Sequence, residues 1–126
     1  MKQKVYHGIL LDVSFTDSNY CLKFKKFNSI ELDGWKLLGV EIDRNLIDDA
    51  VHEIQQAMRI DQPFYNHFYD DEDMIVIFKE KIFNVKTHVS SWTKIIEYGK
   101  ALNIPEVQLD FWPNRFQDEI HYFSKR

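Results

Sequence analysis

The chain has 126 residues, a mass of 15.2 kDa and a formal net charge of -4, which together predict one folded domain spanning residues 1–126. Its hydrophobic share of 44% and charged share of 29% are ordinary for a globular protein, and the aromatic share of 15% supplies large side chains for a core. The acidic charge argues against nucleic-acid binding, and the short apolar runs of the sequence argue against a membrane span.

The first 42 residues are predicted to contain three strands. From Val5 to Phe15 the odd positions are almost all apolar, a period of two that is typical of a strand. Residues 20–27 fit either a helix or a strand. The Asp33-Gly34 pair between two apolar runs is a strong hairpin signal and predicts strands at about 27–32 and 35–42.

Two amphipathic helices are predicted. Asp43 is expected to be the N-cap of a helix that runs to about Arg59, because apolar residues recur with helical spacing at Leu46, Ile47, Ala50, Val51, Ile54, Ala57 and Met58. The second helix is expected to begin near Ser90 or Ser91 and to stop at Asn103 and Pro105. Its apolar stripe consists of Trp92, Ile95, Ile96, Gly99 and Leu102.

The stretch FYNHFYDDEDMIVIF, residues 64–78, predicts a hairpin with strands at 64–69 and 74–78. Its acidic tip, Asp70 to Asp73, is expected to stay in solvent and to oppose pairing with other strand edges. The tip has neither the alternating ligands nor the glycine of a calcium-binding loop, so no metal site is predicted there. The next residues, Lys79, Glu80 and Lys81, either turn the chain or continue the strand into 82–85, and the spacing does not decide which.

The predicted fold class is α+β, a two-layer sandwich in which two amphipathic helices cover one face of a mainly antiparallel sheet of four to six strands. The order of the elements is compatible with a ferredoxin-like arrangement. The C-terminal tail, residues 111–123, mixes aromatic and charged residues and is expected to pack as a cover. The sequence leaves open which face it covers.

Three side chains with polar ends form the main candidate site. If residues 64–69 are a strand, Tyr65, His67 and Tyr69 point to one face and Phe64 and Phe68 to the other. We call the first three the Tyr-His stripe. Its phenols and imidazole can hydrogen-bond a small polar ligand, and His67 can act as a general base near neutral pH. The same residues also suit a half-exposed sheet face or a homodimer interface.

Two further residues join this candidate ligand site. His7 has the pattern of a hydrogen-bonded core histidine, and Arg115 that of a surface arginine paired with Asp118 or Glu119, but both can help the stripe to bind a ligand. Cys21 is the only cysteine and is expected to be a structural thiol. No catalytic residue, metal ligand or cofactor is predicted.

Three stretches, YHGILLDVSF, HFYDDEDMIVIFKEKIFNV and YGKALNIPEVQLDF, resemble a group of small bacterial proteins of similar length with no established activity. The resemblance spans most of the chain. It implies a cytosolic location and a single domain, and it assigns no functional residue.

The leading hypothesis is a non-enzymatic cytoplasmic binding domain that acts as a homodimer. Two helices on one face leave the other face uncovered, and Tyr6 and Leu10 are expected there beside the Tyr-His stripe, an apolar patch that requires a partner. The first alternative is a small-molecule-binding protein or small enzyme that uses the stripe. The second is an acidic inhibitor or immunity-type protein that binds a basic partner through the acidic tip.

Overall fold

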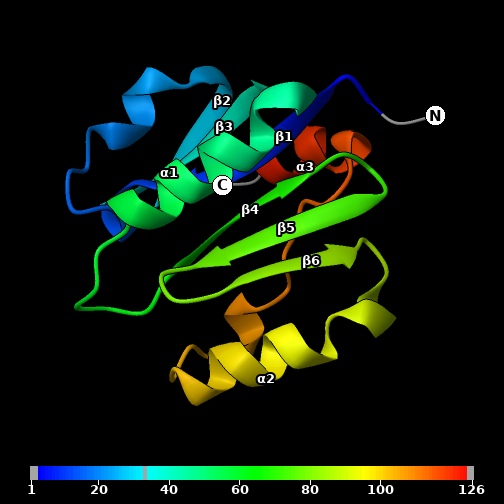
Figure 1. The fold of residues 1–126 in the computed structure, drawn as a ribbon. Coiled ribbons are helices and arrows are strands. Elements are labelled where there is room, and N and C mark those ends of the chain that lie inside the picture. Colours follow the sequence, from blue (N-terminus) through cyan, green and yellow to red (C-terminus); the bar gives the residue numbers. More distant parts are fainter. Residues whose placement is uncertain (1–2, 33, 125–126) are drawn as a thin grey trace.

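The computed structural model describes residues 3–32 and 34–124, which fold around one six-stranded sheet (Figure 1). The strand order is β2-β3-β1-β4-β5-β6, and every neighbouring pair is antiparallel. The strands are β1 (Val5–Leu11), β2 (Lys25–Leu32), β3 (Trp35–Asp43), β4 (Tyr65–Tyr69), β5 (Asp73–Phe78) and β6 (Ile82–Lys86). The predicted α+β class with an antiparallel sheet is therefore confirmed.

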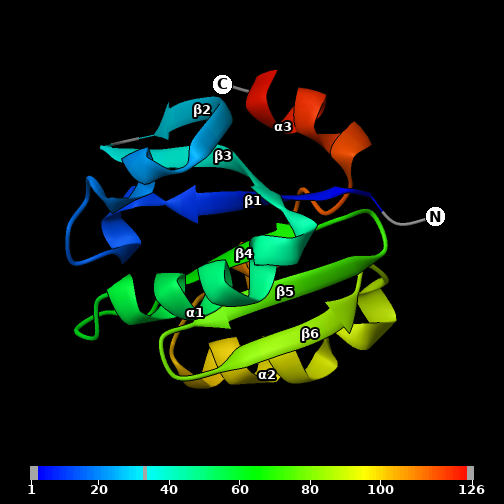
Figure 2. The ribbon, with the colours of Figure 1, turned by 45° about the horizontal axis from the view of Figure 1, so that its top comes forward.

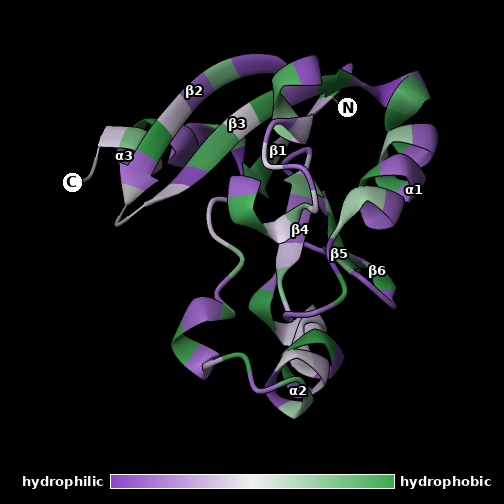
Figure 3. Ribbon diagram, turned by 90° about the vertical axis from the view of Figure 1, so that its left-hand side faces the viewer, coloured by the Kyte–Doolittle hydropathy of each residue, from purple (hydrophilic) through white to green (hydrophobic). Residues whose placement is uncertain are grey.

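The helices lie on both faces of this sheet. α1 (Ile47–Ala57) lies in front of the sheet in Figure 2, and α2 (Thr93–Ala101) lies behind it. α3 (Glu119–Ser124) covers the β1–β3 strands from the side opposite α1, as Figure 3 shows. The expectation that the two long helices share one face is thus corrected in this detail.

Strand β5 explains why both faces are covered. Its residues Ile75 and Ile77 pack under α1, while the alternate residues Met74, Val76 and Phe78 pack under α2. A strand whose side chains are apolar on both sides gains burial only if each face has its own cover. All five of these side chains are buried.

One connection resembles part of a ferredoxin-like pattern. Strands β3 and β4 are both antiparallel to β1, so they run parallel to each other on its two sides, joined through α1. This is a split β-α-β unit. A second such unit would need a strand after α2, and the described chain continues there with turns and α3.

The turns follow the sequence closely. The predicted hairpin at Asp33-Gly34 forms, since Leu32 pairs with Trp35 and Gly34 has a φ of 87°; Asp33 itself lies outside the described residues. The open question at Lys79-Glu80-Lys81 is answered by a turn: the N–H of Phe78 donates to the carbonyl of Lys81 at 2.8 Å, and β6 follows.

The helix boundaries differ by a few residues from the predicted ones. A 3-10 turn at Arg44–Leu46 precedes α1, and the Asp43 side chain makes no capping hydrogen bond. Another at Val89–Ser91 precedes α2, which ends at Ala101, two residues before the predicted stop at Asn103, whose φ is 70°. Residues Tyr20–Lys23 lie in the stretch that fitted either a helix or a strand, and they form a 3-10 turn just before β2. Within the described ranges, no helix combines the length and apolarity needed to cross a membrane.

Candidate ligand-binding cavity

The Tyr-His stripe lies on one face of β4, as the alternation predicted. The ring centroids of Tyr65 and His67 are 6.3 Å apart, and those of His67 and Tyr69 are 5.7 Å apart. Pairing with β1 places Ile9 opposite His67 and His7 opposite Tyr69. The stripe and the odd positions of β1 therefore form one continuous surface on the α2 and α3 side of the sheet.

This register corrects the predicted faces of β1. Tyr6 and Leu10 were expected beside the stripe, but they are buried under α1 together with Phe68. His7 and Ile9 take their place on the stripe's face. Alternation alone could not assign the faces, because β1 has apolar residues at both odd and even positions and both of its faces are covered.

The C-terminal segment, residues 103–124, covers the stripe through the polar end of each of its side chains. The His67 Nε2–H donates to the carbonyl of Pro113 at 2.7 Å. The Tyr65 hydroxyl donates to the carbonyl of Gln108, and the Tyr69 hydroxyl donates to the carboxylate of Glu119. The predicted role of the tail as a cover is confirmed, and the stripe is an interface within the chain.

This cover removes the premise of the homodimer hypothesis. His67 is 3% exposed and Tyr69 is fully buried, so the stripe is not an open apolar patch. Oligomeric state itself stays a prediction, but it now requires a different surface.

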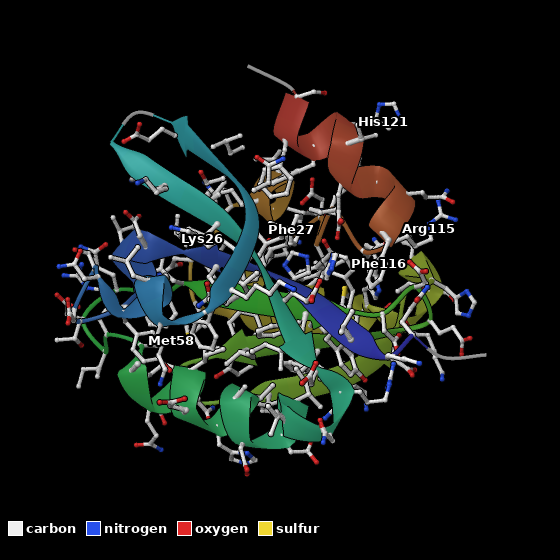
Figure 4. The ribbon with its side chains drawn as sticks, turned by 90° about the horizontal axis from the view of Figure 1, so that it is seen from above. Lys26, Phe27, Met58, Arg115, Phe116 and His121 are labelled. Atoms are coloured by element: carbon white, nitrogen blue, oxygen red, sulfur yellow. The ribbon has the colours of Figure 1, made fainter. Side chains whose placement is uncertain are left out.

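His7 strengthens the attachment of the C-terminal segment. Its imidazole is stacked between the rings of Phe27 and Phe116, at centroid distances of 4.3 and 4.2 Å. Figure 4 shows Phe27 and Phe116 close together near the centre of the molecule, between β2 and the start of α3. The ring nitrogens lie 2.7 Å from a Glu119 carboxylate oxygen and 3.2 Å from one of Glu41. Burial lowers the pKa of His7, but these carboxylates outweigh it and leave the pKa raised.

The acidic tip is only partly in solvent. Asp70 was expected to be solvated, but its carboxylate is buried, pairs with Arg44 and accepts the backbone N–H groups of Glu72 and Asp73. Asp71 accepts the N–H of Phe116 at 2.7 Å. A carboxylate can close a tight turn by binding N–H groups two and three residues further on, and that local bond draws Asp70 inward. These contacts leave the tip a weaker basis for docking a basic partner.

A cavity of about 350 Å³ lies between the sheet and the C-terminal segment. Its floor is formed by the stripe's face of β1, β3 and β4, through Ile9, Leu11, Leu37 and the first two stripe residues. Its roof and rim come from the C-terminal segment, which begins with the loop after α2. The rings that line it are Trp35, Phe64, Tyr65, His67, Trp112 and Tyr122, and the polar side chains are Asn103, Gln108 and Asp110.

Three ring side chains of this cavity, His67, Tyr65 and Tyr122, are held in neutral forms. Burial lowers the pKa of His67 to about 4, against small opposing effects of the Pro113 carbonyl and the Asp110 charge. Burial and then the charge of Asp110 raise the pKa of Tyr65, and they raise that of Tyr122 to about 12. A carbonyl only accepts hydrogen bonds, so Nε2 carries the proton of the neutral His67 ring. With a pKa far below 7, His67 is a poor general base, and the cavity suits binding better than proton transfer.

The other sequence candidates lie outside the cavity. Tyr69 and His7 are further along the same face, and Arg115 lies at the outer edge of the C-terminal segment in Figure 4, 3.8 Å from Asp118. Cys21 is buried, and burial raises the pKa of its thiol to about 12, as suits a structural cysteine. Across residues 3–32 and 34–124, no group of three or more His, Cys, Asp and Glu side chains is placed to hold a metal ion.

Sequence reasoning found two of the cavity residues, Tyr65 and His67, and missed Trp35 and Tyr122. Trp35 begins β3 and reaches the cavity because Leu37, two residues on, pairs with Leu11 of β1. That pairing is non-local, so neither hydrophobic period nor turn chemistry reveals it. The aromatic content of the tail was the available signal for Trp112 and Tyr122.

Comparison with family models, with curated proteins and with solved structures found no match to this chain. The functional argument therefore depends on the geometry of the cavity.

Proposed function

We propose that the protein binds a small organic molecule in the cavity between the sheet and its C-terminal segment. The observation that carries this proposal is a cavity of about 350 Å³ with mostly apolar and aromatic walls and a few polar groups. Ligand sites in proteins have this composition and volumes of roughly 300–1,000 Å³.

The proposal develops the small-molecule alternative of the sequence analysis. Tyr65 and His67 line the cavity and are the two stripe residues that would contact the ligand. Tyr69 and His7 instead contact Glu119, and they position the segment that closes the site. The proposal includes the cytoplasmic location expected from the sequence.

Native mass spectrometry of freshly purified protein, compared with the denatured mass, tests whether a molecule is carried through purification. A titration with the neutral fluorescent probe N-phenyl-1-naphthylamine tests the empty protein. Leu37→Phe fills part of the cavity floor and is expected to weaken probe binding about tenfold or more, since a ring then occupies the ligand's space. Leu22→Phe, at an exposed position away from the cavity, is the matched control and should leave binding unchanged.

Two results would contradict the proposal. One is the absence of both extra mass and probe binding. The other is a Leu37→Phe variant that binds the probe as well as the parent protein does. The expected homodimer and the docking of a basic protein stay as hypotheses, and light scattering after size-exclusion chromatography tests the first of them directly.

A further inference from the structure

The aromatic rings of the cavity come from three separate parts of the chain. Trp35 begins β3, Tyr65 begins β4, and Trp112 and Tyr122 belong to the C-terminal segment. Trp35 is 43% exposed, so this ring lies at the mouth of the cavity, whereas His67 lies in its buried part. The face of an aromatic ring carries a negative electrostatic potential, and several such faces around one space attract a cation.

A single carboxylate adds to this potential. Among the described residues that line the cavity, Asp110 is the one with a formal charge, and no lysine or arginine joins it. The influence of the Asp110 charge reaches three lining residues, since it adds to the raised pKa values of Tyr65 and Tyr122 and opposes the lowering of the pKa of His67. These three residues belong to β4 and to α3, so the carboxylate acts across the cavity and not only on its own neighbours.

The charge of the lining discriminates among ligand classes. An anionic ligand would meet Asp110 with no cation to offset it, and desolvating such a pair of like charges is unfavourable. A neutral apolar ligand would gain from the walls but nothing from Asp110. A cation with an apolar body would use both, because its charge meets the carboxylate and the ring faces while its body fills the space above Ile9 and Leu37.

We propose that the ligand of this cavity is an organic cation, an ammonium group attached to an apolar body about the size of one aromatic ring. This inference rests on the proposed function and specifies the class of ligand. The size follows from the volume, since a protein cavity of about 150 Å³ accommodates benzene and this one is a little more than twice as large.

The test uses two probes of nearly the same shape that differ in charge. (3-Hydroxyphenyl)trimethylammonium carries a quaternary nitrogen where 3-tert-butylphenol has a neutral carbon. Each is titrated into the full chain while the indole N–H resonances of the tryptophans are followed by NMR. Trp35 and Trp112 line the cavity and report binding, while the indole of Trp92 donates to the carbonyl of Lys86 and is the internal reference.

The cation is expected to bind about tenfold tighter than its neutral analogue, as a cation among aromatic rings and one carboxylate should. Asp110→Asn keeps an oxygen that can accept the backbone N–H of Trp112, and it should remove most of that preference while leaving the neutral probe's affinity unchanged. Asp49→Asn makes the same change of charge on α1, across the sheet, and should alter neither affinity.

The outcomes separate the two proposals. If the neutral phenol binds as tightly as the cation, or if Asp110→Asn and Asp49→Asn weaken the cation equally, the inference about charge is wrong and small-molecule binding stands. If neither probe shifts Trp35 or Trp112 and N-phenyl-1-naphthylamine also fails to bind, both proposals are wrong.

Discussion

His7 and His67 lie on the same face of neighbouring strands, yet their pKa values shift in opposite directions. His7 lies against the carboxylates of Glu119 and Glu41, which favour its charged form. His67 is buried and its Nε2–H donates to a carbonyl oxygen, which carries no full charge, so burial dominates and the neutral form is favoured. Both histidines hold the C-terminal segment, one through an ion pair and the other through a neutral hydrogen bond.

The first prediction concerns the charge of His7. Glu119→Gln keeps an acceptor for the Tyr69 hydroxyl but removes the nearer negative charge, so the pKa of His7 should fall. The NMR titration of the His7 ring proton measures this change, with Glu97→Gln on the exposed side of α2 as the control. The pKa of His7 is higher in the folded chain than in the unfolded chain, so protonated His7 stabilises the fold at pH values below the ordinary histidine pKa. This stabilisation is lost as the pH rises through the pKa of the folded state. An unchanged pKa in Glu119→Gln would show that Glu119 is not its cause.

The second prediction concerns His67, for which the sign is opposite. The unfolded chain binds a proton near pH 6.5 and the folded chain only near pH 4, so stability is lost as the pH falls through this window. Between pH 7.5 and pH 5 the loss from this group is about 2 kcal/mol. Urea unfolding of His67→Gln should lack that part of the pH dependence, although its stability at pH 7.5 is lower. Parallel curves for variant and parent would contradict the lowered pKa.

The sequence predicted part of this residue-scale picture. The Tyr-His stripe followed from alternation within one strand, which is local information. The hydrogen bond of His67 to Pro113 and the contact of His7 with Glu119 join residues that are 46 and 112 positions apart in the chain. Contacts at such separations are set by the packing of the whole chain, so spacing could not supply them.

At the scale of elements, the pairing of β1 with β4 depends on a glycine. Gly8 lies opposite Phe68, whose ring atoms would be 2.4 and 2.5 Å from a Cβ at this position. The ring therefore packs over the bare backbone of β1, in the core beneath α1. This contact holds together the two halves of the sheet, since β1 and β4 are neighbours at its centre.

The third prediction is that Gly8→Ala lowers the free energy of unfolding by about 1–3 kcal/mol, the usual cost of overpacking a core. Phe68→Leu creates room next to the new methyl group, so Gly8→Ala should cost at least about 0.5 kcal/mol less in that background. Urea unfolding of the two single variants and the double variant measures this coupling. Equal costs in both backgrounds would mean that the ring is not what excludes a side chain.

Elements with local signals were predicted well, and their arrangement was not. The Asp33-Gly34 hairpin, the hairpin around the acidic tip and both long helices have turn residues or a period that identifies them. The side of the sheet that each helix covers depends on β5, where Met74 to Phe78 are all apolar and every residue is buried. Such a strand is equally apolar on its two faces, so its sequence does not indicate which helix packs on which face.

At the scale of the whole molecule, the cores on the two faces share the same strands. Ile54 of α1 packs over Ile75 and Ile77, and Ile95 of α2 packs over Met74, Val76 and Phe78, all from β5. A loss of order in β5 on one face must disturb the other, because one backbone carries both sets of side chains. The two faces are therefore expected to unfold together as one cooperative unit.

The fourth prediction follows from this sharing. Ile54→Ala and Ile95→Ala each remove a fully buried side chain, and each should lower the free energy of unfolding by about 2–5 kcal/mol. Both variants should show a single urea transition at the same midpoint by far-UV circular dichroism and by tryptophan fluorescence, since the faces cannot unfold separately. Ile60→Ala, at a side chain that is 81% exposed, is the matched control and should change stability by less than about 0.5 kcal/mol. Two separated transitions in Ile95→Ala would instead show that the α2 face unfolds on its own, and the cavity beside it would then open without loss of the α1 core.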